Sequence, residues 1–113
     1  MQIINIEIEE GIPYTLSLTY VDETTNLPID VTGYTAELVV RKAFGSDEIF
    51  LQLSSESGGI ILDGATGNID ATIPEGITWI KASYELLLIN PSSNRIKLAK
   101  GFINVLVSAT IPW

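Results

Sequence analysis

Apolar and polar residues alternate along most of this chain in short runs separated by turns. The alternation is clearest in residues 12–20, 34–40, 69–73 and 84–88. A period of two places every second side chain on one face of an extended strand, so each run predicts a strand with a buried face. Gly, Pro, Asn and Asp fill the intervals, as they do in turns. No segment keeps a helical period over ten residues, so the pattern predicts an all-β fold.

Individual runs also indicate where strands lie in a sheet. Ile4, Ile6 and Ile8 alternate with polar residues, which predicts a first strand at a sheet edge. Residues 60–62 and 69–73 flank a Gly-containing turn and predict a hairpin. Residues 82–89 are apolar on both faces, as expected of a central strand.

The last run, from Arg95 to about Ser108, changes phase part of the way along. Ile96 and Leu98 occupy even positions, whereas the apolar residues of 103–107 occupy odd ones. One additional residue restores a common inward face, so the pattern predicts a β-bulge near Lys100 and Gly101, with Gly101 as the permissive residue.

The number and spacing of the runs predict the architecture. Seven or eight short strands in 113 residues favour a single domain, residues 1–113, folded as a two-layer antiparallel β-sandwich. Such a sandwich covers both faces of its apolar strands. A small closed barrel is the alternative.

Composition and charge narrow the classes of partner. The formal charge of −8 opposes binding to a phosphate backbone, so no nucleic-acid partner is expected. No apolar run approaches the length of a membrane span, and no basic leader followed by an apolar block begins the sequence. We therefore expect no membrane partner and no secretion by that route.

The sequence offers no residue set typical of catalysis. His and Cys are both absent, which excludes a Ser-His or Cys-His nucleophile and the usual zinc ligands. Neighbouring carboxylates such as Asp22 and Glu23 lie in predicted turns or on exposed faces, and their spacing does not match a calcium loop. We expect no enzyme activity, no metal site and no cofactor.

Aromatic and terminal apolar residues are the remaining candidates for contacts. Trp79, Tyr84 and three further tyrosines, Tyr14, Tyr20 and Tyr34, could stack on sugar rings, but their positions favour core packing. Trp113 ends the sequence and could anchor a neighbouring subunit or fold back on its own sandwich. Together with the predicted edge strand, it gives a candidate interface of Ile4, Ile6, Ile8, Ile111 and Trp113.

Five segments of the sequence resemble segments of the small immunoglobulin-like β-sandwich proteins and modules of tailed-bacteriophage virions, and they occur in the same order as in that family. In that family one strand is preceded by a motif with the order proline, apolar, aspartate, apolar, threonine, glycine. A strand with the motif Tyr-x-Leu then leads through a turn to a final strand with the motif glycine, apolar, apolar, x, valine. The corresponding residues here are 11–18, 27–36, 67–73, 84–86 and 100–105.

The resemblance implies a multi-copy structural component of a virion, in its tail, baseplate or fibre-attachment region. Its partners would be other virion proteins or copies of itself, and it implies no catalytic residues. A carbohydrate-binding sandwich that recognises cell-surface glycans through exposed aromatic residues is the alternative function.

Overall fold

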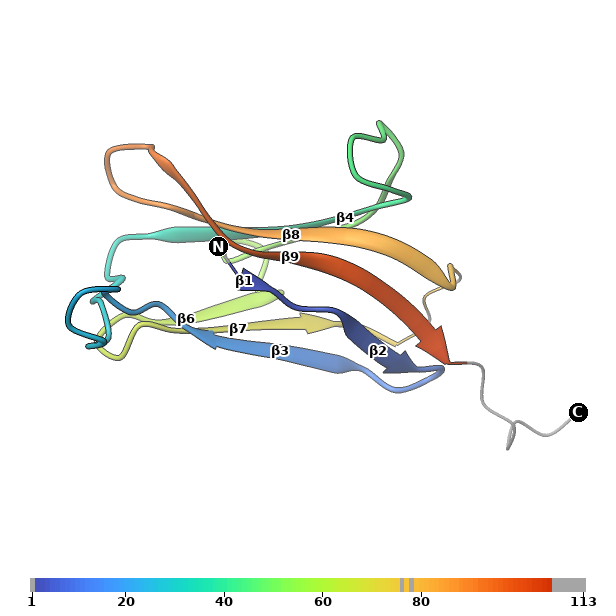
Figure 1. Cartoon of the computed structure of the whole chain (residues 1–113), viewed down its shortest axis with the longest axis horizontal. Coiled ribbons are helices and arrows are strands. Elements are labelled where there is room, and N and C mark those ends of the chain that lie inside the picture. Colours follow the sequence, from blue (N-terminus) through green and yellow to red (C-terminus); the bar gives the residue numbers. More distant parts are fainter. Residues whose placement is uncertain (1, 76, 78, 107–113) are drawn as a thin grey trace, which may run out of the picture.

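The computed structural model describes residues 2–75, 77 and 79–106, which form two β-sheets packed face to face (Figure 1). No helix occurs among these residues. The strands are β1 (Gln2–Ile3), β2 (Ile6–Glu9), β3 (Tyr14–Thr19), β4 (Thr35–Arg41), β5 (Ile49–Ser54), β6 (Ile60–Asp63), β7 (Asn68–Ile73), β8 (Lys81–Ile89) and β9 (Arg95–Leu106).

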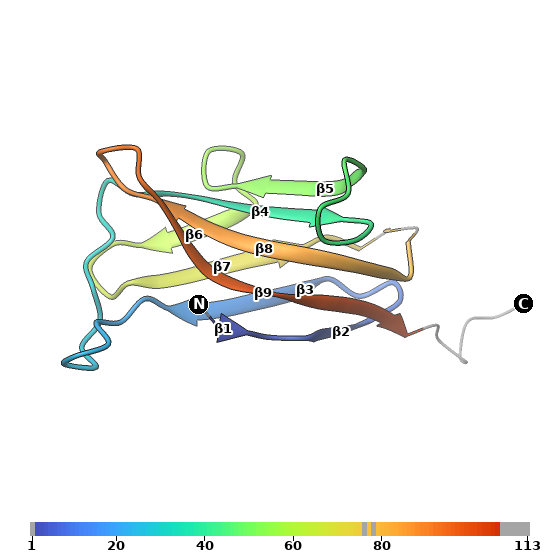
Figure 2. The same cartoon turned by 45° about the horizontal axis from the view of Figure 1, so that its top comes forward.

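The order of the strands defines an immunoglobulin-like β-sandwich. The larger sheet has the order β1-β9-β8-β4-β5, with β2 also paired to β9, and the smaller sheet has the order β3-β7-β6. This order matches the two immunoglobulin sheets if β3, β4, β8 and β9 are taken as strands B, C, F and G. Figure 1 shows the two sheets as separate layers, and in the turned view of Figure 2 the larger sheet lies over the smaller one. The sandwich prediction is therefore confirmed, and the closed barrel is excluded for the described residues.

The inner faces of both sheets supply the core. Leu16, Ile69 and Ile73 of the smaller sheet are at most 4% exposed, and so are Leu38 and Ile103 of the larger sheet. Burial of each such side chain contributes about 1.5–3 kcal/mol, which explains how a domain without disulfides is held together. The inward positions are those that the alternation predicts.

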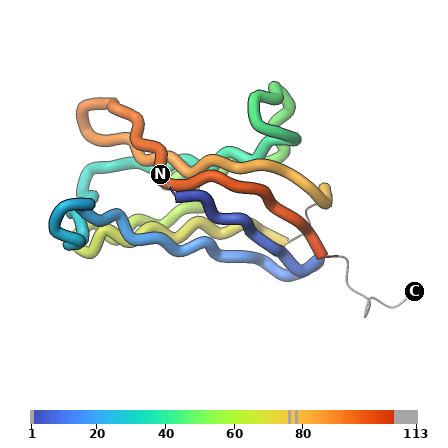
Figure 3. Tube along the Cα trace, viewed as in Figure 1, coloured from blue at the N-terminus to red at the C-terminus, as the bar shows by residue number. Residues whose placement is uncertain are grey.

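Three predictions about single strands are confirmed. The strands β6 and β7 form the expected antiparallel hairpin. Strand β8 lies between β4 and β9 and is central in the larger sheet. The N-terminal strand lies at the edge, where β1 and β2 run parallel to β9 with a step between them (Figure 3).

A bulge interrupts the pairing of β9, but not where the sequence pattern places it. Leu86 opposes Ala99 and Leu87 opposes Lys97, so Leu98 is the additional residue. Beyond it, Ala99, Gly101 and Ile103 all face inward. The predicted position near Lys100 and Gly101 is wrong by two or three residues, because the phase change falls between Leu98 and Ile103 and alternation alone does not locate the extra residue within that interval.

Gly101 has a different role, at the step between β1 and β2. A Cβ atom at this position would overlap the carbonyl group of Ile4. The close approach allows three hydrogen bonds: the Ile4 amide donates to Lys100 O (2.9 Å), the Tyr84 hydroxyl donates to Ile4 O (2.6 Å), and the Phe102 amide donates to Asn5 Oδ1 (3.0 Å). We call this group the N-terminal latch. These hydrogen bonds join the segment between β1 and β2 to strands β8 and β9.

The latch also affects the chemistry of Tyr84. This residue is only 1% exposed. Burial, and secondarily the nearby Tyr14, raise the pKa of Tyr84 to about 12. Its hydroxyl therefore remains a hydrogen-bond donor at any physiological pH.

The loop of residues 28–33, which lies within the second of the five segments described above, has a structural role. Asp30 Oδ1 accepts hydrogen bonds from the hydroxyl (2.5 Å) and the amide (2.8 Å) of Thr32, and these bonds lower the pKa of the Asp30 carboxyl. Val31 is buried, and its amide donates to Gly64 O at 2.8 Å. Gly33 supplies a φ of +83° where the chain turns into β4. The hydrogen bond from Val31 to Gly64 joins this loop to the turn before β7.

Candidate functional site

The structure places the predicted interface residues mainly in or against the core. Ile6 is 1% exposed and Ile8 is 2% exposed, because both side chains point toward the smaller sheet. Ile4 is partly buried against the same core. The side chains of Ile6 and Ile8 are therefore not available to a partner, whereas the backbone of β2 lies at the edge of the larger sheet, and its contact with a partner stays a prediction. Ile111 and Trp113 lie outside the described residues.

The aromatic residues considered for sugar stacking also pack inward. Trp79 is partly buried and stacks on Phe50, with ring centroids 5.8 Å apart and planes at 13°. Tyr84 is buried, and Tyr14, Tyr20 and Tyr34 pack against the core. Core packing, which the sequence favoured, is confirmed.

Two other aromatic residues are exposed on the outer face of the larger sheet. Phe102 of β9 is 55% exposed and Phe44 of the β4–β5 loop is 43% exposed. Their rings meet edge to face with centroids 5.4 Å apart, and Lys100 Nζ lies 5.5 Å from the centroid of the Phe44 ring. Alternation marks Phe102 as outward, since Ile103 is inward, but nothing in the sequence indicates that the loop brings Phe44 to it.

Hydrogen bonds hold the β4–β5 loop in the shape that presents Phe44. Arg41 Nη1 donates to Ser46 O (2.9 Å), and the Lys42 amide donates to Glu48 O (3.1 Å). Gly45 adopts a φ of +79°, which allows the tight turn. The loop is therefore anchored at both ends of its excursion from the sheet (Figure 1).

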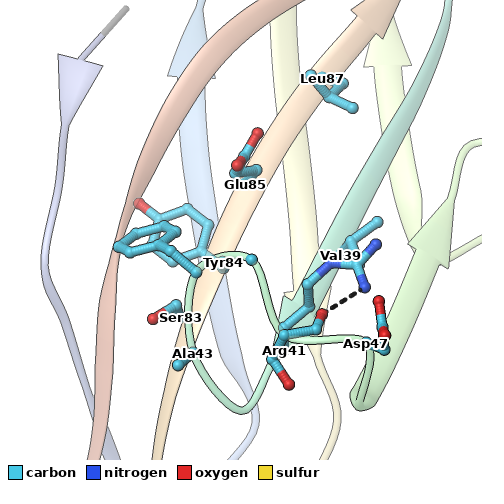
Figure 4. A pocket seen from close by; sticks show the side chains of 11 residues that line it. Val39, Arg41, Ala43, Asp47, Ser83, Tyr84, Glu85 and Leu87 are labelled. Atoms are coloured by element: carbon cyan, nitrogen blue, oxygen red, sulfur yellow. Dashed lines mark hydrogen bonds between the residues drawn. The ribbon is translucent and has the colours of Figure 1, made fainter.

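An open groove of about 370 Å³ lies between this loop and the outer face of β4 and β8. Figure 4 shows Arg41 and Asp47 from the loop side and Ser83, Glu85 and Leu87 from β8 around it. Val39 and Leu87 give it an apolar floor, whereas Arg41, Asp47 and Glu85 give it a charged rim. Its complete lining is Val39, Arg41, Ala43, Phe44, Gly45, Ser46, Asp47, Ser83, Tyr84, Glu85 and Leu87.

Five of the six basic residues face outward on the larger sheet. Lys81, Arg95, Lys97 and Lys100 occupy outward positions of β8 and β9, opposite Asn104, Ile89, Leu87 and Glu85 respectively. We call these four cations the basic ridge. Arg41 is at the end of the neighbouring strand β4, and Lys42 follows it.

The charge of the basic ridge is opposite to that of the rest of the surface. Glu85 is the one carboxylate among the outward positions of β8 and β9, 3.8 Å from Lys97, so the outer face of these two strands has a formal charge of +3, whereas Glu37 faces outward on the neighbouring strand β4. The whole sequence has −8, which leaves −11 for the remainder.

The outer face of the smaller sheet is polar and without cations. The outward residues are Thr15, Ser17 and Thr19 of β3, Asn68, Asp70 and Thr72 of β7, and Ile61 and Asp63 of β6. Cross-strand hydrogen bonds join Thr15 to Thr72 (3.0 Å) and Thr19 to Asn68 (2.6 Å). Ile61 stands out from this face with 67% exposure.

Neither a metal centre nor a membrane helix is found in the described ranges. Among these residues no three or more carboxylates gather where they could hold one metal ion. The same part of the chain contains no helix that is long and apolar enough to span a bilayer.

Comparisons with known proteins give a distant structural similarity. No protein family matches the sequence, and no curated protein matches it. A solved structure of extracellular domains 3–5 of Drosophila OTK is similar, with 18% identity and a TM-score of 0.43. The similarity covers 92% of this chain and 32% of that one. The class of the protein, an immunoglobulin-like β-sandwich, rests on its own strand order.

Proposed function

We propose that this chain is a non-enzymatic structural component of a tailed-bacteriophage virion, present in several copies in the tail, baseplate or fibre-attachment region. The five sequence segments that resemble the phage sandwich modules support this proposal. Two of them, the loop of residues 28–33 and the Tyr84 strand, have structural roles in this chain rather than chemical ones.

The observation that best supports a role in protein contacts is the outer face of the larger sheet. Phe44 and Phe102 form an exposed aromatic pair, and aromatic residues are enriched at the centres of protein interfaces. Such a surface on a rigid β-sheet suits assembly. A component with this role works in the virion and needs no cofactor.

Quantitative mass spectrometry of gradient-purified particles tests the proposal directly. Particles released from the organism that encodes the chain should contain it at a constant ratio of more than one copy per portal or tail. Brief treatment with a chaotrope that removes loosely adsorbed host proteins is the control. Particles that are complete by electron microscopy and lack the chain would contradict the proposal.

A carbohydrate-binding module is the second candidate, favoured by the exposed Phe44 ring at the edge of a groove with polar groups from Arg41, Ser46 and Asp47. A glycan array would then show binding that Phe44→Ala abolishes and Trp79→Ala does not abolish in a folded variant. Signals at background for the unmodified protein would eliminate this candidate.

A further inference from the structure

A second groove, of about 320 Å³, lies between the first part of β9 and the end of β3. Ile96 and Leu98 line it from the larger sheet, and Leu18 and Tyr20 line it from β3 and the residue that follows. These four side chains are partly buried and pack against the core. We call this opening the β9 groove, and it continues the apolar interior of the sandwich to the surface.

The β9 groove is open because the N-terminal edge strand covers only part of β9. Pairing on this side of β9 begins where Gln2 lies opposite Ala99, and no described residue pairs there with residues 95–98. Figure 2 shows β1 beginning part of the way along β9. Further along the same side, β2 places Ile6 and Ile8 between the sheets. A strand in line with β1 and β2, with the same alternation, would fill the groove in the same way.

Residues 107–113, which we call segment 107–113, have this alternation. Their apolar residues occupy odd positions, in phase with the inward Ile103 and the partly buried Val105 of β9. The described part of the chain supplies no neighbouring strand for them, since the last pairs of β9 join Asn104 to Lys81 and Leu106 to Glu9. A period of two predicts a strand with one apolar face. The apolar positions of segment 107–113 are Val107, Ala109, Ile111 and Trp113.

Proline in this segment restricts how it pairs. Pro112 has no amide hydrogen, so its nitrogen must face away from a neighbouring strand, as in prolines of edge strands. Ile111 and Trp113, on either side of it, then direct their amides toward the neighbour. An edge position fits the segment, and the β9 groove lies at an edge.

The β9 groove of the same copy is out of reach of this segment. Leu106 and Leu98 are eight positions apart in β9, which corresponds to about 26 Å along a strand. The five residues from Val107 to Ile111 span at most about 18 Å when fully extended, so Ile111 cannot return from Leu106 to Leu98. Strands β1 and β2 also occupy that side of β9. The groove therefore suits the segment of a second copy.

We propose that segment 107–113 of one copy adds as a short strand to residues 95–98 of the next copy, in line with β1, and places Ile111 and Trp113 in the β9 groove. The inference rests on the multi-copy role proposed above. The segment follows the end of β9 and the groove lies at its beginning, so the contact is head to tail. Each copy gives one segment and receives one, and the assembly closes into a ring or extends as a stack according to the rotation between neighbours.

Salt should strengthen this association. The contact consists of apolar side chains and backbone hydrogen bonds, whereas each copy has a net charge of −8 and repels the next. The Debye length falls from about 30 Å at 0.01 M salt to about 8 Å at 0.15 M, which screens the repulsion between copies. Sedimentation velocity at these two salt concentrations should show larger oligomers at the higher one.

Two complementary variants and their mixture test the contact by the same method. The segment variant is Ile111→Ser with Trp113→Ser, and the groove variant is Gln2→Glu with Val21→Glu. Gln2 and Val21 both line the groove at exposed positions, and circular dichroism checks that each variant folds. We expect the unmodified protein to form a series of oligomers with concentration. Each variant alone should associate at least about tenfold more weakly, because interface anchors commonly contribute more than the 1.4 kcal/mol to which that factor corresponds, about one power of ten in Kd.

The mixture distinguishes this geometry from others. Each variant keeps the element that the other has lost, so an equimolar mixture should form a one-to-one dimer that grows no further. The matched control is Ser17→Glu with Gln52→Glu, which adds the same charge at exposed positions outside the groove. This control and Ile61→Ser, which removes an exposed isoleucine from the smaller sheet, should assemble as the unmodified protein does.

Cross-linking shows which copy receives the segment. The sequence has no cysteine, so Val21→Cys with Trp113→Cys introduces a single pair of thiols. Mild oxidation should give disulfide-linked oligomers on a non-reducing gel. A disulfide within one chain, or cross-linking no greater than with Ser17→Cys in place of Val21→Cys, would overturn the proposed contact.

Four results in solution would also overturn it: an unmodified protein that stays monomeric at millimolar concentration, a segment variant that assembles normally, a mixture that remains monomeric, or association that weakens as salt rises to 0.15 M. The first result leaves the virion role to be decided by the particle composition. The others leave a multi-copy role intact and refute only this contact.

Discussion

Gly101→Ala should destabilise the protein, although the same change at an ordinary strand position would stabilise it. Glycine within a strand costs about 0.5–1 kcal/mol relative to alanine because of its greater freedom in the unfolded chain. At this position, however, a Cβ atom would overlap the carbonyl group of Ile4. The edge strand must then move away from β9.

The magnitude follows from the three hydrogen bonds of the N-terminal latch. They join Ile4 to Lys100 (2.9 Å), Tyr84 to Ile4 (2.6 Å) and Phe102 to Asn5 (3.0 Å). Each contributes about 1 kcal/mol, so their loss costs about 3 kcal/mol and the net destabilisation is about 2 kcal/mol. Urea unfolding followed by tryptophan fluorescence, with Trp79 stacked in the sandwich as a reporter, measures this value.

A double-mutant cycle with Tyr84→Phe separates the latch from other causes. Removal of the Tyr84 hydroxyl should cost about 1 kcal/mol in the unmodified protein and almost nothing in Gly101→Ala, because the same hydrogen bond is already broken. Gly11→Ala is the control. Gly11 has a φ of +82°, and a Cβ atom there would meet nothing within 4 Å, so the cost of this change should add to that of Tyr84→Phe. A neutral or stabilising Gly101→Ala, or full additivity with Tyr84→Phe, would refute the latch.

Three further outcomes follow from burial and titration. Ile6→Ala should lower the free energy of unfolding by about 2–5 kcal/mol in urea melts, whereas Ile3→Ala, at a 72% exposed position, should change it by less than about 0.5 kcal/mol; equal effects would contradict the placement of Ile6 in the core. The pKa of Tyr84, raised to about 12, gives a stabilisation that is complete below about pH 10, the ordinary tyrosine value, and is lost as the pH rises through the folded pKa. The difference in melting temperature between the unmodified protein and Tyr84→Phe should therefore shrink between those pH values, and a constant difference would argue against the buried hydroxyl. The pKa of Asp30, lowered by its hydrogen bonds with Thr32, gives a stabilisation that is present above the ordinary aspartate range and is lost as the pH falls through the folded pKa; Asp30→Asn should lack this acid-dependent part in thermal melts at pH 6 and pH 3, and parallel curves would contradict it.

The chain also shows which parts of a sandwich can be predicted from alternation. The inward residues of β3, β4 and β7 are where a period of two places them, because a strand has only two faces and one must be buried. Ile6 and Ile8 followed the same rule. Their side chains fill the core, so only the backbone of this edge strand is open to a partner.

The bulge and the exposed aromatic pair show the limit of such predictions. The phase change in the last strand indicates one extra residue, but only the pairing of β9 with β8 shows that this residue is Leu98. Phe102 was identifiable as outward, yet Phe44 reaches it only because hydrogen bonds bend the β4–β5 loop over the sheet. A contact between residues 58 positions apart depends on a loop conformation that local pattern does not specify.

The sequence by itself determined that this protein is all β, which faces of its strands are buried, where its main turns lie, and that no histidine or cysteine chemistry is available. These properties follow from local periodicity and residue chemistry. The tertiary structure alone decided which strands are neighbours. By bringing β4, β8 and β9 together, it placed five of the six cations, together with Glu37 and Glu85, on the outer face of the larger sheet, and by placing Ile4 against Gly101 it gave that glycine its role. Both depend on contacts between distant segments, which only the packing of the two sheets establishes.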